Sequence, residues 1–419
     1  MKKWRIFSGR VLSLIMIGLM LSAALTGCGA LGDAAGPPVP VAEVSPSVSA
    51  PAPTPTPTPQ PRGSVTITVN VIGDVMMHSP QIPAGYDRAT GTYNYDHFFE
   101  GITETISRAD LSIANLETPT AGEANNGYSG YPLFNAPDAL LTALQKAGVD
   151  VLATANNHCL DRRRSGLIQT IETMDELGIP HTGTFKNQEE SDKILFQEIN
   201  EVKVAIIAYT YGCNGMENTL EASELKWMVN MLDKDAMVAD IKKAREQGAD
   251  IVLVMPHWGA EYVRQPADET VELAKALVAA GADVIVGSHP HVAQPIEWLT
   301  VQDDSGKDVT GLVYYSTGNF ISNQRDPYTD WGIMAEFGIE KNLDTGEVKI
   351  VDPAYIPTYV HRFAGTKSTS DYNVVPAGEY ASDEQRAASL GSDGSSRVKK
   401  AWSQAVEHLG EDVAKPLEK

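Results

Sequence analysis

The sequence is poor in cysteine and in positive charge. Its 419 residues include only Cys28, Cys159 and Cys213, which excludes the disulfide framework typical of small secreted domains. Lysine and arginine number 33 against 54 aspartate and glutamate residues, for a formal net charge of −21. A surface of this sign repels nucleic acid and anionic lipid headgroups. An anionic substrate would therefore need local positive charge, from a metal ion or from an arginine cluster.

A glycine-rich phosphate loop is also absent. The first predicted strand, Val65–Ile72, is followed by Gly73-Asp74 and not by the spaced glycines of a nucleotide-binding turn. This argues against a nucleotide-binding protein. The hydrophobic content of 42% is sufficient for a sizeable core, in one large or two modest domains.

The first 27 residues are typical of a secretory signal. Met1–Arg10 is basic, and Val11–Leu25 is almost wholly apolar but shorter than the about 20 residues of a membrane span. The tetrad Leu25-Thr26-Gly27-Cys28 resembles the bacterial lipobox, in which the cysteine becomes the lipid-modified first residue. We therefore expect residues 1–27 to be a lipoprotein signal peptide and Cys28 to be lipidated, with an uncleaved signal anchor as the alternative. Two acyl chains are sufficient for stable anchoring, here at the extracellular face of the cell membrane.

Residues 28–63 form the next segment, which is dense in proline, threonine and serine. It contains the run Thr54-Pro55-Thr56-Pro57-Thr58-Pro59. Such a composition cannot bury a core and favours the polyproline II conformation. At about 3.1 Å per residue it would make a stiff tether that holds the folded part away from the membrane.

From Ser64 onward, predicted strands alternate with predicted helices. The strands after Val65–Ile72 are Leu111–Ala114, Val149–Thr154, Val202–Tyr209, Ile251–Val254, Val284–Val286 and Val313–Tyr315. The helical patterns between them are Pro137–Gly148, Ser165–Gly178, Asp233–Gly248 and Ala267–Gly281. This alternation predicts an α/β (α+β) fold.

The pattern changes after Asn319. Two runs, Gly332–Lys341 and Gly346–Val360, predict an antiparallel hairpin, and therefore a mixed sheet or a second sheet. We expect the main domain to cover residues 64–364. Residues 365–419 would be a C-terminal extension, partly helical over Val398–Leu409, whose place in the fold the sequence does not predict.

Polar residues gather where the predicted strands end. Ligands of α/β sheets bind beyond the carboxyl ends of the strands, and Asp, Glu, Asn and His are ligands for divalent cations. The residues at these ends are Asp74, Asn115, Glu117, Asn156, Asn157, His158, His257, His289 and His291. Each one alone has an ordinary structural explanation, such as a helix cap or a hydrogen-bonded core histidine. Their joint occurrence favours a single metal site.

Four longer blocks carry a resemblance to a known family. They are Asn156–Asp161, Pro256–Tyr262, Gly287–Pro295 and Tyr315–Phe320. With Gly73-Asp74 and Asn115–Glu117, they resemble the signature blocks of the CapA family, in order, over about Val65 to Phe320. That family is named for poly-γ-glutamate capsule synthesis and is similar to calcineurin-like metallophosphoesterases. The resemblance implies a four-layer sandwich of two mixed β-sheets flanked by helices, with a centre of two divalent metal ions.

The resemblance also implies which residues hold the metal ions. Ligands of the first ion would be Asp74, Glu117 and His291. Ligands of the second would be Glu117, in the bridging position, with Asn157, His257 and His289. The first block departs from the superfamily pattern Asp-x-His, because four positions and not two separate Asp74 from His78. His78 is therefore only a candidate ligand.

Catalytic and substrate-binding roles follow from the same blocks. His158 matches a proton donor, and Asp161, three residues on, suits the carboxylate that orients it. Cys159 is interpreted as a packed thiol and not as a nucleophile. Candidates for substrate binding are Asn115, Asn156, Arg162, Ser316 and Asn319. Arg162 opens the run Arg162-Arg163-Arg164, which suits either an anion-binding patch or a solvated helix start.

Two functions are consistent with these observations. The first is a metal-dependent hydrolase that acts outside the cell on a phosphoester or a capsule-related amide. The alternative is a non-catalytic metal-binding component that binds, exports or assembles an anionic capsule polymer, in contact with a membrane capsule synthase complex. Neither function implies a nucleic-acid partner.

Overall fold

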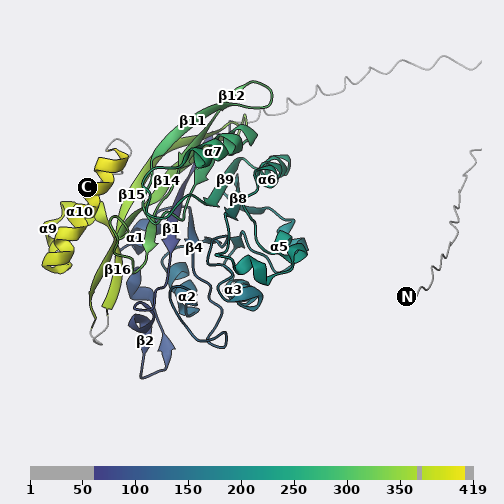
Figure 1. The fold of residues 1–419 in the computed structure, drawn as a ribbon. Coiled ribbons are helices and arrows are strands. Elements are labelled where there is room, and N and C mark those ends of the chain that lie inside the picture. The colour runs from purple at the N-terminus through teal and green to yellow at the C-terminus, as the bar shows by residue number, and fades with distance from the viewer. Residues whose placement is uncertain (1–60, 366–369, 411–419) are drawn as a thin grey trace, which may run out of the picture. The chain divides into compact units, whose positions relative to one another are not determined.

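The computed structural model describes residues 61–365 and 370–410 (Figure 1). The predicted signal peptide, Cys28 and almost all of the predicted tether lie outside these residues. Within the described ranges, none of the helices has the length and apolar character needed to cross a membrane.

One sheet of eight strands is organised around β1 (Ser64–Val75). Its order is β16-β15-β14-β1-β4-β5-β6, with β13 also paired to β1. The bounds are β4 (Leu111–Leu116), β5 (Val151–Ala153), β6 (His181–Thr182), β13 (Asn319–Ile321), β14 (Trp331–Asn342), β15 (Val348–Ala364) and β16 (Ser370–Pro376). Because β1 runs parallel to β4 but antiparallel to β14, the sheet is mixed.

The second sheet has six strands in the order β11-β12-β10-β9-β8-β7. Their bounds are β7 (Leu195–Ile199), β8 (Val202–Thr210), β9 (Ile251–His257), β10 (Val284–Val286), β11 (Ile296–Gln302) and β12 (Asp308–Tyr314). The four central strands are parallel, and the two edge strands are antiparallel to them. A separate small ribbon pairs β2 (Tyr86–Asp87) with β3 (Thr92–Tyr93).

Three apolar layers hold the sheets and helices together. Between the sheets, Val69 and Ile113 of the first pack with Ile206 and Leu253 of the second. On the outer face of the eight-stranded sheet lie α2 (Ala139–Lys146) and α3 (Arg163–Leu177). On the outer face of the six-stranded sheet lie α6 (Lys234–Glu246) and α7 (Asp268–Ala280). The predicted α/β class and the four-layer sandwich are thus confirmed.

The shorter helices lie in the connections. Their bounds are α1 (Thr103–Ile106), α4 (Gln188–Ser191), α5 (Ala222–Met228), α8 (Ala377–Ser382) and α9 (Glu384–Ser389), followed by the longer α10 (Gly391–Leu409). Three-residue or four-residue 3₁₀ turns occur at Ile82–Gly85, Asp96–Phe98 and Met216–Thr219.

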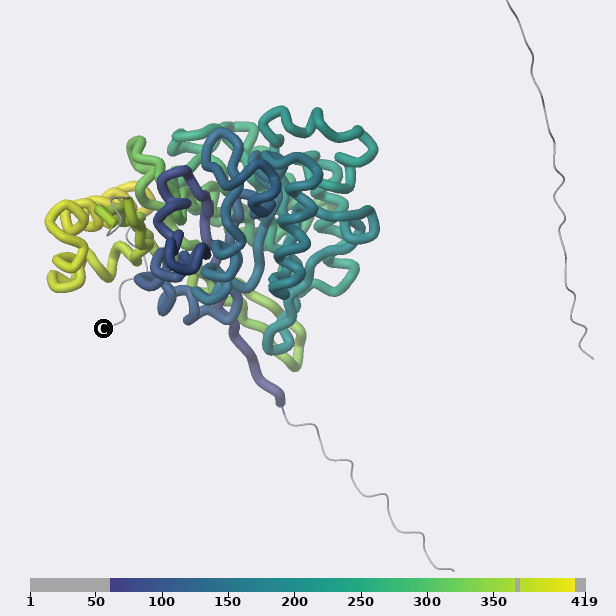
Figure 2. Tube along the Cα trace, turned by 90° about the horizontal axis from the view of Figure 1, so that it is seen from below, coloured from purple at the N-terminus to yellow at the C-terminus, as the bar shows by residue number. Residues whose placement is uncertain are grey.

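The C-terminal residues continue the eight-stranded sheet. The predicted hairpin is present as β14 and β15, and β16 pairs antiparallel with β15. The helices α8 to α10 (yellow in Figures 1 and 2) follow, and α10 buries Val398 and Ala401 in the same core as Trp331 and Tyr355. The division of the chain into signal peptide, tether, main domain and extension remains a prediction.

Candidate metal centre

The carboxyl ends of parallel strands from both sheets meet at one place. Asp74 is the last residue but one of β1, Glu117 follows β4 directly, and His257 is the last residue of β9. His289 and His291 lie in the turn after β10. All five side chains are buried.

The approach of β1 to its neighbour requires a glycine before Asp74. A Cβ atom on Gly73 would lie 2.1 Å from the carbonyl oxygen of Gly318, far inside contact distance. Gly318, with φ of 68°, itself adopts the left-handed conformation that favours glycine. The backbone of Gly73-Asp74 is therefore in direct contact with the backbone of Ser316–Asn319, and this contact needs a glycine at position 73.

The first group of candidate ligands is Asp74, Glu117 and His291. One ligand atom from each lies within 4.8 Å of the others. His291 donates from Nδ1 to Asp74 Oδ2 (3.0 Å), and its Nε2 lies 3.8 Å from Glu117 Oε1. Asn115 donates from Nδ2 to Asp74 Oδ1 (2.8 Å) and so fixes that carboxylate.

The second group is Glu117, His257 and His289, again within 4.8 Å of one another. His257 Nε2 lies 3.5 Å from Glu117 Oε1 and 3.1 Å from Asn157 Oδ1. Asn157 is therefore next to this group, as the resemblance implies for a ligand of the second ion. Ser288 Oγ, 2.8 Å from His257 Nδ1, holds the other side of the ring.

The backbone of the histidine turn is unusual. His289 has φ of 100° and His291 has φ of 59°, in the left-handed region that non-glycine residues seldom occupy. Such conformations cost of order 1–3 kcal/mol each and occur mostly where the surrounding structure imposes them, often at functional sites. The turn directs both imidazoles toward the same carboxylate, Glu117, on whose oxygens the two groups converge.

Unpartnered buried atoms show that the two groups fit a bound cation. Both carboxylate oxygens of Glu117 and the Nδ1 of His289 are buried and have no hydrogen-bond partner among the described residues. A buried carboxylate without a partner is costly, and a divalent cation would satisfy it. The oxygen and imidazole donors suit Mn²⁺, Zn²⁺, Fe²⁺ or Mg²⁺. The residues present therefore form a site that could hold divalent metal.

The protonation states agree with this fit. Burial lowers the pKa of His257 to about 3, and burial together with His257 and His291 lowers the pKa of His289 to about 2. Both rings are then neutral near pH 7, as metal ligation requires. Burial and the nearby Asp74 raise the pKa of Glu117 well above its usual value.

Asp74 and His291 instead behave as a buried ion pair. Burial alone would raise the pKa of Asp74, but the hydrogen bond and charge of His291 outweigh it and lower that pKa. Burial likewise opposes protonation of His291, whereas Glu117 and Asp74 raise its pKa to about 9. A cation that binds through His291 must therefore displace a proton.

His158 and Asp161 form the predicted pair beside the second group. His158 donates from Nδ1 to Asp161 Oδ2 (2.8 Å), and the backbone N–H of Phe134 donates to the same oxygen (2.7 Å). The Phe134 ring packs edge-on against His158, with 4.6 Å between ring centroids. The pair is buried, which raises the pKa of Asp161. The ring of His158 is thus held by contacts on two sides.

His78 lies outside both groups. Its Nδ1 accepts a hydrogen bond from the backbone of Asn323 (3.3 Å), and its ring packs against Phe134. The two residues before it, Met76 and Met77, are buried in the core. The longer spacing from Asp74 thus leaves His78 in the wall of the site and away from the grouped ligand atoms.

The candidate substrate-binding asparagines are engaged inside the protein. Asn156 donates to the backbone oxygen of Leu116 (2.7 Å) and to Asn115 Oδ1 (3.4 Å), and both asparagines are buried. Asn319, also buried, donates to the backbone oxygen of Thr329 (2.9 Å). Ser316 Oγ accepts from the backbone N–H of Gly318 (3.2 Å). These contacts hold the loops that carry the ligands.

The arginine run is also engaged. Arg162 donates to the backbone oxygen of Leu133 (3.0 Å) and to the hydroxyl of Ser129, and Arg164 pairs with Glu224 (2.5 Å). Arg162 therefore fastens the loop that carries Phe134.

Two residues of the site were missed by the sequence analysis. Tyr211 is the first residue after β8, and its ring lies 4.6 Å from that of His289. Its position at a strand end is the signal that could have identified it. Glu261 forms a third group of ligand atoms with His289 and His291, also within 4.8 Å, but it is exposed and follows no strand.

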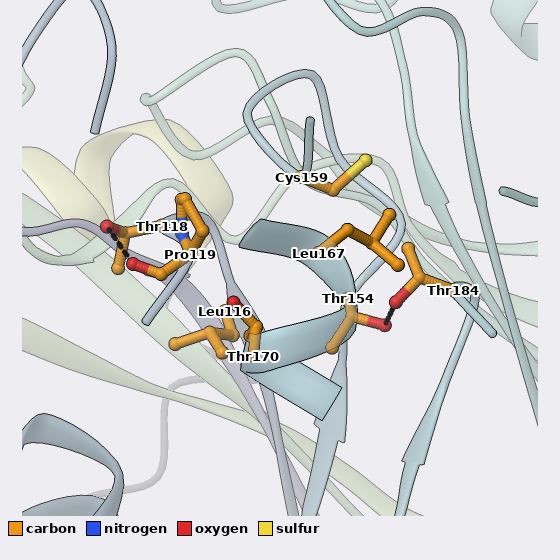
Figure 3. Close-up of a pocket in the computed structure, with 8 residues that line it drawn as sticks. All are labelled: Leu116, Thr118, Pro119, Thr154, Cys159, Leu167, Thr170 and Thr184. Atoms are coloured by element: carbon orange, nitrogen blue, oxygen red, sulfur yellow. Dashed lines mark hydrogen bonds between the residues drawn. The ribbon is translucent and has the colours of Figure 1, made fainter. Parts of the chain in front are cut away.

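A small cavity behind the site has no catalytic character. It is lined by apolar and threonine side chains around Cys159 (Figure 3). The hydroxyls of Thr154 and Thr184 bond to each other (2.7 Å). Cys159 Sγ lies 3.7 Å from Cys213 Sγ, and this contact together with burial raises the pKa of Cys213. The environment is that of packed thiols.

Comparisons with known proteins extend over most of the described domain. The family described as "Bacterial capsule synthesis protein PGA_cap" matches residues 68–324. The "Capsule biosynthesis protein CapA" of Bacillus anthracis is 29% identical over 282 residues, which cover 65% of this chain and 64% of that protein. The "PGA biosynthesis protein CapA" of Bacillus subtilis (strain 168) is 27% identical over 285 residues, 67% of this chain and 69% of that protein. This chain thus matches less than two thirds of the first relative's length.

Among solved structures, the chain is similar to the calcineurin-like phosphoesterase YfkN from Bacillus subtilis. The TM-score is 0.42 at 13% identity, and the match covers 83% of this chain and 100% of that one. A likeness of this size carries no functional argument.

Proposed function

Because the chain belongs to the bacterial capsule synthesis protein PGA_cap family, we propose that it is a divalent-metal-dependent hydrolase of CapA type. Its substrate would be a phosphoester or a capsule-related amide. The observation that supports this proposal is the pair of ligand groups that share Glu117, next to the buried His158–Asp161 pair. Capsule synthesis in the names of the relatives is consistent with an anionic polymer as substrate.

We assign the metal-holding roles as follows. Asp74, Glu117 and His291 would hold one ion, and Glu117, Asn157, His257 and His289 a second. Bound divalent metal contributes Lewis acidity, which activates water near neutral pH and stabilises negative charge on the reacting group.

His158 supplies the proton that the leaving group needs. In this role the ring carries a proton on each nitrogen: Asp161 holds the Nδ1–H and orients the ring, and the Nε2–H is the proton given to the leaving group. The Phe134 ring covers one side of the imidazole and excludes water there. Asp161 is a positioning residue in this scheme, because it acts through His158.

The test compares metal content and turnover in the same preparations. His158→Ala should retain bound metal and lose about 10²–10⁴-fold in turnover of a generic phosphodiester, and Asp161→Asn should show part of that loss. His257→Ala should lose metal as well as turnover. His181→Ala, a half-buried histidine on β6, is the matched control and should change neither. Full turnover by His158→Ala would contradict the proposed role.

The second candidate function is a non-catalytic metal-binding component of capsule polymer assembly. The observation that favours it is the place of His78, which leaves the first group with three ligand residues. Wild-type protein that binds metal but turns over neither phosphodiesters nor γ-linked glutamyl peptides would support this candidate over the hydrolase.

We further propose that the protein is lipid-anchored through Cys28 at the extracellular face of the cell membrane. The support is the sequence alone, from the basic and apolar segments through Leu25-Thr26-Gly27-Cys28.

A further inference from the structure

A second cavity lies between α10 and the loop that joins β13 to β14. Its volume is about 310 Å³, and residues 325–330 of that loop line one side of it while α10 lines the other. The cationic side chains that line it are Arg325, Arg397 and Lys400.

The positive charge of this cavity is only partly matched. Arg397 is shared by Asp393 (Nε to Oδ2, 2.8 Å) and Asp330 (Nη1 to Oδ2, 3.7 Å). In contrast, Arg325 and Lys400 form no ion pair with any residue in the described parts of the chain. Asp326, which is exposed, also lines the cavity.

Several guanidinium N–H groups near this loop have no acceptor among the described residues. Arg325 donates from Nη1 to the backbone oxygen of Gln324 (2.6 Å), but its Nη2 is buried without a partner in the described structure. Arg264 lies over the ring of Tyr328, which lines the cavity, at 4.1 Å from the centroid. Its Nε and Nη2 are likewise buried and unpartnered.

Other charged residues lie close to Arg325. Burial and the nearby Arg362 lower the pKa of Arg325, and Asp330, which also lines the cavity, opposes this shift only in part. This arrangement occurs in a chain whose formal net charge is −21. An anionic group in the cavity would lie against this positive charge, and a carboxylate matches the planar fork of arginine.

The same loop also contacts the metal centre. Gln324, next to Arg325, donates from Nε2 to the hydroxyl of Tyr262 (3.2 Å), and the Tyr262 ring lies 6.1 Å from that of His291. Asn323 donates to His78. One short segment therefore has the candidate metal centre on one side and the cationic cavity on the other.

From this geometry we propose that the cavity is a carboxylate-binding subsite for an acidic polymer. It holds one carboxylate of a polyglutamate-like chain through Arg325 and Lys400, while another part of the chain reaches the metal centre. The assignment of substrate class rests on the proposed function, but the subsite itself is a binding site and does not require turnover.

The experiment measures binding without catalysis. The full chain, purified in detergent and treated with EDTA, is titrated against a fluorescent γ-linked hexaglutamate at low ionic strength. Arg325→Gln/Lys400→Gln should weaken binding by about 10- to 100-fold, because two charge-assisted contacts are lost. Lys400→Gln alone, at an exposed position where a substitution should leave the fold intact, should show part of the loss.

The matched control is Arg88→Gln/Lys307→Gln, which removes the same charge from two exposed positions outside the cavity. It should change the dissociation constant less than about 3-fold, as expected from long-range electrostatics that salt screens. Equal losses in both double variants, or wild-type affinity in Arg325→Gln/Lys400→Gln, would overturn the subsite. So would displacement of the probe by neutral hexaglutamine at equal concentration.

Failure of this proposal and failure of the proposed function give different results. If the subsite is wrong, the double variant binds normally whatever the turnover of the wild type. If the hydrolase is wrong, no substrate is turned over, but binding of the hexaglutamate in EDTA still depends on Arg325 and Lys400.

Discussion

Replacing Glu117 by glutamine should change the stability of metal-free and metal-bound protein in opposite directions. Both oxygens of this carboxylate are buried without a hydrogen-bond partner in the described structure, and Asp74 lies nearby. Without a cation, the ionised group therefore destabilises the folded protein. Glutamine keeps the shape and removes the charge, so the metal-free variant should be the more stable one. When metal is added, the variant lacks the ligand that both groups share, so its stability should rise little.

The magnitude follows from the burial. A buried polar group left without a partner costs about 1–3 kcal/mol, and more when it is charged. For a folded region of about 350 residues this corresponds to a rise in Tm of roughly 1–4 °C in the metal-free variant. Metal at 100 times its Kd should stabilise wild type by about 2.7 kcal/mol, or roughly 4 °C, and the variant by much less. Because the folded-state pKa of Glu117 is raised, its destabilising effect develops as pH rises above the ordinary glutamate pKa. The higher Tm of metal-free Glu117→Gln should therefore disappear at a pH below the ordinary glutamate pKa.

The assay is thermal unfolding of both proteins after EDTA treatment and again with excess Mn²⁺ or Zn²⁺. Glu172→Gln, at an exposed position on α3, removes the same charge and should leave both Tm values within about 1 °C of wild type. A Glu117→Gln protein that is less stable in EDTA and still gains the full metal shift would refute the reasoning, because Glu117 would then be neither strained by burial nor a ligand.

Three further predictions concern other parts of the chain. His289→Ala and His257→Ala should each lower bound metal, measured by elemental analysis of protein purified without chelator; unchanged metal in both would exclude the second ligand group. Cys28→Ala should move the protein from the membrane fraction to the medium or leave its signal peptide uncleaved, as measured by cell fractionation and mass spectrometry. Unchanged processing and fractionation would contradict the lipoprotein assignment. Cys159 and Cys213, both buried, should resist alkylation in the folded protein and react after denaturation, as counted by mass spectrometry; rapid labelling of folded protein would contradict their packing.

The strands and the ligand groups were predictable because their signals are local. Val65–Ile72 is apolar and β-branched, and Asp74 follows at its end, so the strand and the placing of the carboxylate are both apparent from a few consecutive residues. His289 and His291 occur on one turn. The parallel order of the strands then brings these tips together, as the α/β pattern implies.

Other features depend on contacts that no local pattern reports. The sequence shows the longer spacing between Asp74 and His78, but only the packing of Met76 and Met77 places the His78 ring. The helix α10 begins at Gly391, within a Ser/Gly/Asp-rich patch that has poor helix propensity, because Val398 and residues after it pack on the sheet.

The cationic cavity was not predictable for the same reason. Arg325 and Lys400 are 75 positions apart, and the short basic stretch Arg397-Val398-Lys399-Lys400 does not show by itself that Arg325 lies next to it. In the run Arg162-Arg163-Arg164, which the sequence suggests as either an anion-binding patch or a helix start, Arg162 fastens a loop and Arg164 pairs with Glu224. The fold can bring together charged residues that are far apart in the sequence. Charged residues that are clustered in the sequence can instead form ion pairs and hydrogen bonds that hold loops in place.

The place where the chain enters β1 lies away from the candidate metal centre. Arg62, just before the strand, is fastened by its backbone to Asp344 (2.9 Å) and by its side chain to Glu201 (2.5 Å). Asp74 lies near the other end of the same strand, ten residues after its first residue Ser64, which at about 3.3 Å per residue is roughly 33 Å away. The point at which the N-terminal segment joins the folded domain and the candidate metal centre are therefore separated by most of the length of this strand, so a change at one end of β1 need not disturb the other.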